Sequence, residues 1–172
     1  IAAVAVLEER KGHVCLLKAV QRLIGQGYGA GITVIIEGSG TLLESLKAFV
    51  VEAGLSENVR FIGNEANVFN LLNAADVVVL PSIANEDFPN VVIEAMCLGK
   101  VVIASRISGT PEQIAHMESG ILVEPMDVHG LADAVRLVAD DEHLRNRLGR
   151  NAADRFREKF NAKTSVNKYC KL

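Results

Sequence analysis

Residues 76–105 read DVVVLPSIANEDFPNVVIEAMCLGKVVIAS, and this stretch decides the class of fold. It opens with an apolar run at residues 76–80 and ends with another at residues 101–105. Between them, residues 90–98 have the length and composition of a short helix, which Gly99 ends. Strands that are apolar without alternation are buried on both faces, as in a parallel sheet covered by helices. The stretch therefore predicts a strand, a helix and a second, parallel strand.

The same alternation of short β-branched runs and segments of helical period extends along the chain. Further strands are predicted at Ile1–Leu7, Ile32–Glu37, Val59–Ile62 and Gly120–Val123. Further helices are predicted at His13–Gln26, Thr41–Ala53, Val68–Ala74, Pro111–His116, Asp127–Asp140 and Glu142–Phe160. Arg60 interrupts one of the strands, which suits an edge position. We expect a single domain, residues 1–172, of class α/β: an open, doubly wound parallel sheet of about six strands with helices on both faces.

Composition excludes several classes of protein. The 172 residues carry a formal net charge of −3 and 49% are hydrophobic, which excludes intrinsic disorder. No run of Lys or Arg is long enough to bind along a polyanion, so nucleic acid is not expected as the main partner. The longest apolar runs are far shorter than the ~20 residues of a membrane-spanning helix. The chain starts without Met and without the basic region of a signal peptide, so we expect part of a longer protein.

The three cysteines, Cys15, Cys97 and Cys170, have no CxxC spacing. Cys15 and Cys97 stand among apolar residues, and we expect them to be reduced and to lie in the core. Reduced cysteines are typical of the cytoplasm, so cytoplasmic localisation is expected.

The glycine and lysine residues that follow two of the predicted strands are of the kind that binds a phosphate group. In a parallel sheet, ligands bind outside the carboxyl ends of the strands. Gly38-Ser39-Gly40 would let backbone N–H groups meet a phosphate at a helix start, or would simply connect strand to helix. It lacks the third glycine of GxGxxG, because position 43 is Leu43. Lys11, beside Gly12, would neutralise a diphosphate or remain solvated.

Two glutamates form the sharpest feature. Glu86 lies in the loop before the predicted helix at residues 90–98, and Glu94 lies within that otherwise apolar helix. An acid in such a place requires a partner, either a ligand hydroxyl or a protein donor. For Glu86 the alternative is a solvated loop acid. No His or third acid follows at a suitable spacing, so no metal site is predicted.

Six motifs in a fixed order carry a family resemblance. They are Lys11-Gly12, Glu37-Gly38-Ser39-Gly40, Val59-Arg60-Phe61-Ile62-Gly63, the segment 74–82, the segment 86–96 and Gly109-Thr110-Pro111-Glu112. Together they closely resemble the C-terminal domain of retaining glycosyltransferases of family 4. Those enzymes have the GT-B fold, in which two Rossmann-like domains face a cleft. The most specific part is the pair Glu86 and Glu94, separated by seven residues.

The resemblance implies that this domain binds the nucleotide-sugar donor and that Glu86 and Lys11 are its catalytic residues. Glu86 would hold hydroxyls of the donor sugar, and Lys11 would neutralise the departing diphosphate. The remaining residues implied to bind the donor are Glu94, at the ribose hydroxyls; Asp87, Phe88, Asn90 and Val91, around the diphosphate; Asn64, beside the base; Gly38; and Arg10.

Two positions depart from the family pattern. An arginine usually stands about five residues before the lysine, where this chain has Val6, and Arg10 is the nearby cation that would take its place. Pro89 stands where many members carry Gly and has no N–H to offer a phosphate.

The implied function is transfer of a hexose or N-acetylhexosamine, with UDP favoured over GDP as the carrier, to a glycan or lipid-linked oligosaccharide. Surface polysaccharide such as O-antigen is the expected product. No metal or other cofactor is expected. The partners would be an N-terminal acceptor domain absent from this chain and the inner face of the cytoplasmic membrane, and the chain alone would catalyse little. The alternatives are a non-catalytic nucleotide-binding module and a sugar-nucleotide epimerase.

Overall fold

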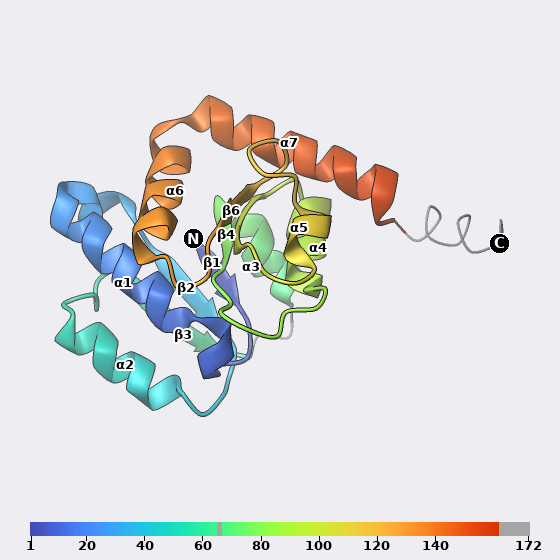
Figure 1. The fold of residues 1–172 in the computed structure, drawn as a ribbon. Helices are drawn as coiled ribbons and strands as arrows, with labels where there is room; N and C mark the ends of the chain where they lie inside the picture. Colours follow the sequence, from blue (N-terminus) through green and yellow to red (C-terminus); the bar gives the residue numbers. More distant parts are fainter. Residues whose placement is uncertain (65–66, 162–172) are drawn as a thin grey trace.

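The computed structural model describes residues 1–64 and 67–161, and it forms a six-stranded sheet between two layers of helices (Figure 1). All neighbouring strands are parallel and their order is β3-β2-β1-β4-β5-β6. The strands are β1 Ala2–Val4, β2 Val34–Glu37, β3 Val59–Gly63, β4 Val77–Leu80, β5 Val101–Ser105 and β6 Ile121–Val123. The predicted doubly wound, Rossmann-like fold is confirmed, with β3 at an edge. Strand order reverses between β1 and β4.

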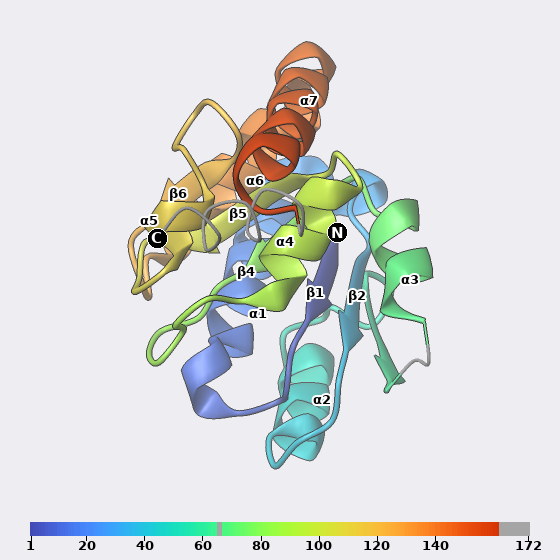
Figure 2. The ribbon, with the colours of Figure 1, turned by 90° about the vertical axis from the view of Figure 1, so that its right-hand side faces the viewer.

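The helices fall on opposite faces of this sheet (Figures 1 and 2). One core lies under α1 His13–Leu23, α2 Leu43–Glu52 and α6 Val128–Asp140. The other lies under α3 Val68–Ala74 and α4 Asn90–Cys97. The short helix α5 Thr110–Gln113 lies beside α4. Single turns at Glu9–Lys11 (η1), Ile24–Tyr28 (η2) and Gly29–Gly31 (η3) complete the described secondary structure.

The predicted elements exist, but several end elsewhere. The first strand was predicted to reach Leu7 and ends at Val4, because the chain bends at Ala5. The Ala5 and Leu7 amides still donate to the carbonyls of Glu37, the last residue of β2, and of Ser39, which follows it. The first helix ends at Leu23, ahead of Gly27, whose φ is 95°. The helix predicted at Pro111–His116 spans only Thr110–Gln113, because Ile114 is extended.

The expectation for the cysteines was partly wrong. Cys15 and Cys97 are both free thiols, but Cys97 is exposed because it is the last residue of α4 and lies on the outer side of that helix. Cys15 is partly buried. Cys170 lies outside the described residues.

The C-terminal helix α7, Glu142–Lys159, joins the two cores. Leu144 and Leu148 belong to the core under α1 and α6, whereas Ala152 belongs to the core under α4. At the crossing, Gly149 lies so close to the turn after α4 that a Cβ there would come well within 3.0 Å of the carbonyl oxygen of Gly99. A glycine is therefore required at this point of the helix.

We expect Gly149→Ala to lower the free energy of unfolding by about 1–2 kcal/mol. Alanine gains about 1 kcal/mol in helix propensity. Overpacking costs about 1–3 kcal/mol, and a collision with a backbone oxygen belongs at the upper end of that range, about 2–3 kcal/mol. Gly25→Ala is the control, since a Cβ there meets no atom within 4 Å. Denaturant unfolding measures both variants, and a Gly149→Ala chain as stable as the wild type would contradict the close approach.

Candidate functional site

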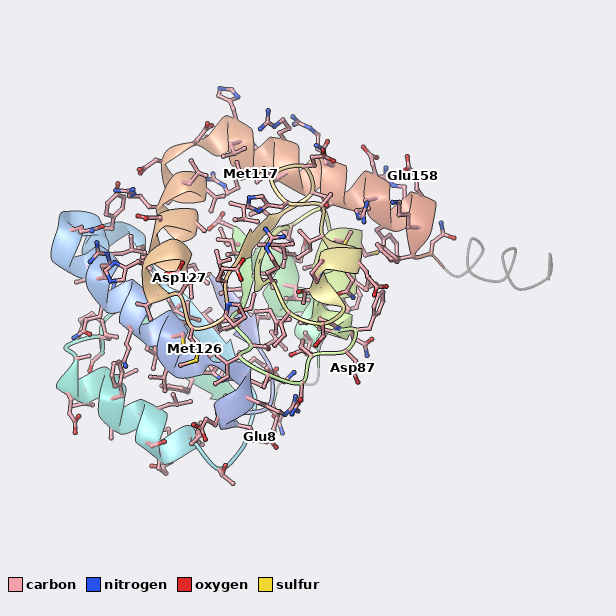
Figure 3. The ribbon with its side chains drawn as sticks, in the orientation of Figure 1. Glu8, Asp87, Met117, Met126, Asp127 and Glu158 are labelled. Carbon is pink, nitrogen blue, oxygen red and sulfur yellow. The ribbon has the colours of Figure 1, made fainter. Side chains whose placement is uncertain are left out.

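The site lies where strand order reverses, at the carboxyl ends of β1 and β4. The chain after β1 forms the turn η1, and the chain after β4 forms a nine-residue loop, residues 81–89, that leads into α4. Figure 3 shows Glu8 and Asp87, which belong to these two loops, at the same end of the molecule. Open α/β sheets bind ligands at this kind of reversal, so the position agrees with the one expected from the sequence.

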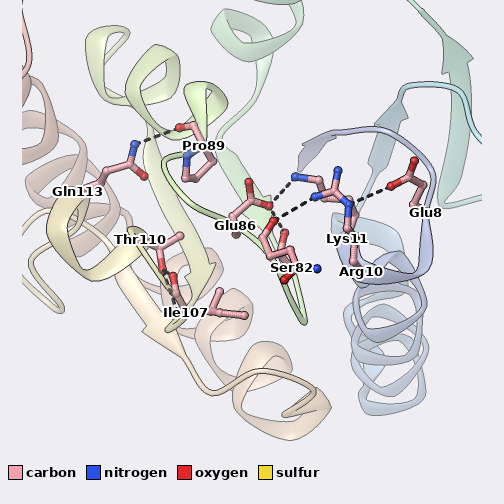
Figure 4. Close-up of polar contacts among 10 residues, drawn as sticks. Glu8, Arg10, Lys11, Ser82, Glu86, Pro89, Ile107, Thr110 and Gln113 are labelled. Atoms are coloured by element: carbon pink, nitrogen blue, oxygen red, sulfur yellow. Dashed lines mark hydrogen bonds and ion pairs between the residues drawn. The ribbon is translucent and has the colours of Figure 1, made fainter.

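A buried ion pair joins the two loops. Nζ of Lys11 lies 2.5 Å from Oε2 of Glu86, and the side chains are only 12% and 7% exposed. Ser82 Oγ donates a second hydrogen bond, of 2.6 Å, to the same oxygen. Figure 4 shows the Glu86 carboxylate between Ser82 and Lys11. The alternative of a solvated loop acid at Glu86 is therefore wrong.

The loop that carries Glu86 is held from both sides by glycines. Gly12 has a φ of 67°, and a Cβ there would come well within 3.0 Å of the Pro81 carbonyl oxygen. Gly109, after β5, approaches the Asp87 carbonyl oxygen as closely and donates its N–H to the Glu86 carbonyl at 3.3 Å. The Ile83 N–H also donates to the Arg10 carbonyl at 2.8 Å. Backbone contacts on both flanks thus fix the position of Glu86.

Arg10 reaches the same loop from the side of β1. Its Nε lies 2.9 Å from Oε2 of Glu8, and one terminal N–H donates to the Asn85 carbonyl at 3.1 Å. A second cation therefore lies beside the residue that precedes Glu86 in the chain. Val6 is at the surface of this region.

The N-terminus of α4 is open. No described residue accepts a hydrogen bond from the amides of Asn90 or Val91, the first two of the helix. The preceding Pro89 carbonyl accepts from Val92 N–H at 3.2 Å and from Nε2 of the buried Gln113 at 3.1 Å. The helix start is thus anchored while two N–H groups remain available, which favours an anion there.

Glu94 lies in α4, and its side chain is partly buried. Among residues 1–64 and 67–161, no donor contacts its carboxylate. The sequence left two partners open for Glu94, a ligand hydroxyl and a protein donor. The described residues provide no protein donor.

The remaining predicted residues lie around this centre. Gly38 donates its N–H to the Gly63 carbonyl at 2.7 Å, and Asn64 Nδ2 donates to Ser39 Oγ at 3.0 Å, so the loops after β2 and β3 are joined. Asp87 and Phe88 are exposed. The Phe88 ring meets Phe160 edge to face, with centroids 5.8 Å apart. Sequence reasoning missed Ser82, whose only signal was a hydroxyl directly after a buried strand and four residues before Glu86.

Metal clusters and membrane-spanning helices are both absent from the described part of the chain. No three His, Cys, Asp or Glu side chains there gather as a metal site would require. No helix there has the length and apolarity needed to span a membrane.

The chain matches a known protein family over most of its length. The model of glycosyl transferases group 1 matches residues 1–155. The chain belongs to this family. The glycosyltransferase domain is 32% identical over 163 residues to a D-inositol 3-phosphate glycosyltransferase of Corynebacterium glutamicum, covering 91% of this chain and 39% of that protein. It is 32% identical over 164 residues to the lipopolysaccharide core biosynthesis glycosyltransferase LpsD of Rhizobium meliloti, covering 95% of this chain and 46% of that protein.

A solved relative shows the fold with ligands. The structure of HepE from Anabaena in complex with UDP and glucose superposes with a TM-score of 0.90 and 26% identity, over 99% of this chain and 46% of that one. HepE has also been solved with UDP-glucose. The glycosyltransferase domain therefore spans less than half of the length of these relatives. That an N-terminal acceptor domain completes the protein stays a prediction.

Gly12→Ala should destabilise the domain by more than an unfavourable φ alone would. Gly54→Ala is the matched control. The φ of Gly54, 69°, is within two degrees of that of Gly12, and a Cβ at Gly54 meets nothing within 4 Å. Left-handed backbone costs a non-glycine residue about 1 kcal/mol, which both variants share. The collision with Pro81 should cost Gly12→Ala about 1–3 kcal/mol more. Urea unfolding checks this, and equal losses in the two variants would show that the loops are not in close contact.

His13, the first residue of α1, adds a buried titratable group beside the site. Its side chain is 1% exposed, and no described residue bonds Nδ1. Burial, and to a smaller extent the nearby Lys11 ammonium, lowers the pKa of His13 from 6.5 to about 4. The folded domain therefore holds His13 neutral.

Because the unfolded state binds a proton at His13 at a higher pH than the folded state, stability should fall with acidification. From pH 7 to pH 4 the loss due to His13 is about 3 kcal/mol, absent above pH 7 and growing as the pH drops below 6.5. Unfolding across this range should show a shallower pH dependence for His13→Leu than for the wild type. The exposed His143, replaced by Gln, is the control and should leave the pH dependence unchanged.

Proposed function

We propose that this domain binds the nucleotide-sugar donor of a retaining glycosyltransferase of family 4. The observation that carries the proposal is the buried Lys11–Glu86 pair beside the open N-terminus of α4. One strand-order reversal carries a cation, two free amides and a carboxylate with a free oxygen. This set of groups suits a sugar joined to a diphosphate. The UDP and UDP-glucose complexes of HepE support a uridine nucleotide.

In this proposal the diphosphate binds between η1 and the start of α4. Lys11 has three N–H bonds and uses one on Glu86, which leaves two for phosphate oxygens. The amides of Asn90 and Val91 donate from the other side. Arg10 supplies the second cation that the family usually places at the position of Val6, by turning toward the phosphate the terminal N–H group that donates to the Asn85 carbonyl.

The other predicted residues contact the rest of the donor. Glu86 accepts from hydroxyls of the sugar, and Glu94 accepts from the ribose, which explains a partly buried carboxylate with no described protein donor. Asp87 and Phe88 border the diphosphate segment. Gly38 and Asn64, in the joined loops after β2 and β3, border the base.

Catalysis in this arrangement rests on stabilising the leaving group. The bond between the anomeric carbon and the diphosphate oxygen breaks, the diphosphate leaves with the electron pair, and the acceptor oxygen bonds to the carbon and gives its proton to the diphosphate. Charge grows on the diphosphate in the transition state, where the Lys11 ammonium and the α4 amides act on it. In this proposal the Lys11 ammonium and the α4 amides take the place of a metal ion, and no other cofactor takes part.

The transferred sugar is proposed to be a hexose or N-acetylhexosamine and the acceptor a glycan or lipid-linked oligosaccharide of a surface polysaccharide such as O-antigen. The relative named for lipopolysaccharide core biosynthesis supports this acceptor class. An N-terminal domain would supply the acceptor site, and the complete protein would work in the cytoplasm at the inner membrane face.

A second candidate, a nucleotide-binding module without catalysis, is favoured by one observation. Val6 offers no charge where the family usually has arginine. Binding of UDP together with no turnover of UDP-sugars in the complete protein would select it.

The domain should bind UDP without added metal, and Glu94→Gln should weaken that binding about tenfold. The ribose hydroxyls would lose a charged acceptor, and hydrogen bonds to charged groups contribute about 1.5–3 kcal/mol. Because no described protein group depends on Glu94, the melting temperature should change little. Calorimetric titration with UDP, GDP and ADP, before and after adding magnesium, measures affinity and base preference.

Glu52→Gln, at an exposed position of α2, removes the same charge far from the site and should leave UDP binding unchanged. A large loss of stability in Glu94→Gln with normal UDP binding would mean that Glu94 is structural. Absence of binding to all three nucleotides would remove the main support for the proposed function.

A further inference from the structure

Ser82 is the third side chain of the cluster that Lys11 and Glu86 form, and the proposed function does not use it. It is fully buried, at 0% exposure, and lies two residues after β4. Its hydroxyl donates to Oε2 of Glu86 at 2.6 Å, a length typical of a strong bond to a charged oxygen. A buried hydroxyl with this geometry has one fixed direction.

The two oxygens of Glu86 differ in their surroundings. Oε2 accepts from both Lys11 Nζ and Ser82 Oγ. In the part of the chain that the structure describes, no donor contacts Oε1. Oε1 is also not among the fully buried side-chain atoms without a partner, so it reaches solvent. The carboxylate therefore presents one occupied oxygen to the protein and one open oxygen to the site.

Lys11 alone would not fix this orientation. Its flexible side chain ends in an ammonium that must also serve a diphosphate, whereas Ser82 is held by its short side chain and by the contact of Gly12 with the neighbouring Pro81. The bond from Ser82 is thus the rigid one of the two.

We propose that Ser82 is a positioning residue that holds Oε2 of Glu86 and so directs Oε1 toward a hydroxyl of the donor sugar. This rests on the proposed function. Ser82 then acts on recognition of the sugar through Glu86, while the contacts of Lys11 and the α4 amides with the diphosphate do not depend on it. Removing the hydroxyl should therefore affect a nucleotide sugar and not the bare nucleotide.

The test compares UDP with UDP-glucose and UDP-N-acetylglucosamine as probes of the wild-type chain and of Ser82→Ala. For the sugar nucleotide that the wild type binds, the affinity should fall about tenfold, and the affinity for UDP should stay within about twofold. Ser119→Ala is the matched control, because Ser119 is also a buried serine, and its hydroxyl accepts a hydrogen bond from the Ala115 amide outside the site. It should change neither affinity.

A double-mutant cycle separates positioning from general damage. In a Glu86→Gln background, adding Ser82→Ala should produce no further loss of sugar-nucleotide affinity, because the group through which Ser82 acts is already altered. If Ser82→Ala does not give a folded chain, Ser82→Cys, a weaker donor of similar size, supplies the same comparison.

Equal losses for UDP and the sugar nucleotide, no loss for either, or additive losses in the cycle would each overturn the role of Ser82 and leave the proposed function standing. Binding of UDP with no binding of either sugar nucleotide would also overturn it. A wild-type chain that binds none of UDP, GDP and ADP would overturn the proposed function and this inference together.

Discussion

The arrangement of the site depends on one buried ion pair, between Lys11 and Glu86. Both side chains are nearly removed from water, and a charge in such a place is stable only when it is paired and hydrogen-bonded. Because the two residues are 75 positions apart, the pair also ties the loop after β1 to the loop after β4. The glycine at position 12 makes that approach possible, since any side chain there would hold the two loops apart, and Gly109 allows the loop after β5 to approach Asp87 in the same way.

The rest of the fold supports these two loops. Parallel strands whose order reverses between β1 and β4 leave their carboxyl ends side by side, and the helices that follow both point their N-termini toward that edge. Behind the site, Gln113 holds the Pro89 carbonyl at the start of α4, and Arg155 of α7 donates to the carbonyls of Gln113 and Glu112. The end of α7 thereby helps to position the helix start that the proposal assigns to the diphosphate.

Local sequence patterns were sufficient for the fold but only partly for the site. Apolar runs such as Val77–Leu80 predict buried parallel strands, and residues 68–74 were predicted as a helix with the bounds that α3 has. Strand ends were less predictable: Ala5 and Leu7 continue the apolar run and their amides still bond to Glu37 and Ser39, yet the chain bends at Ala5 and the strand ends at Val4. The pairing of Lys11 with Glu86 and the bond from Ser82 depend on contacts between distant segments, which no local periodicity encodes. Cys97 stands in an apolar stretch and is nonetheless exposed, because one side of a surface helix faces water.

The placement of β1 also has a consequence during protein synthesis. Its neighbours in the sheet are β2, about 30 residues later, and β4, about 75 residues later. After β2 has paired, one edge of β1 stays unpaired until β4 has left the ribosome, and an open strand edge is a template for pairing with other chains. The position that gives the donor site its two loops is thus also the place where a growing chain is most exposed to wrong strand pairing.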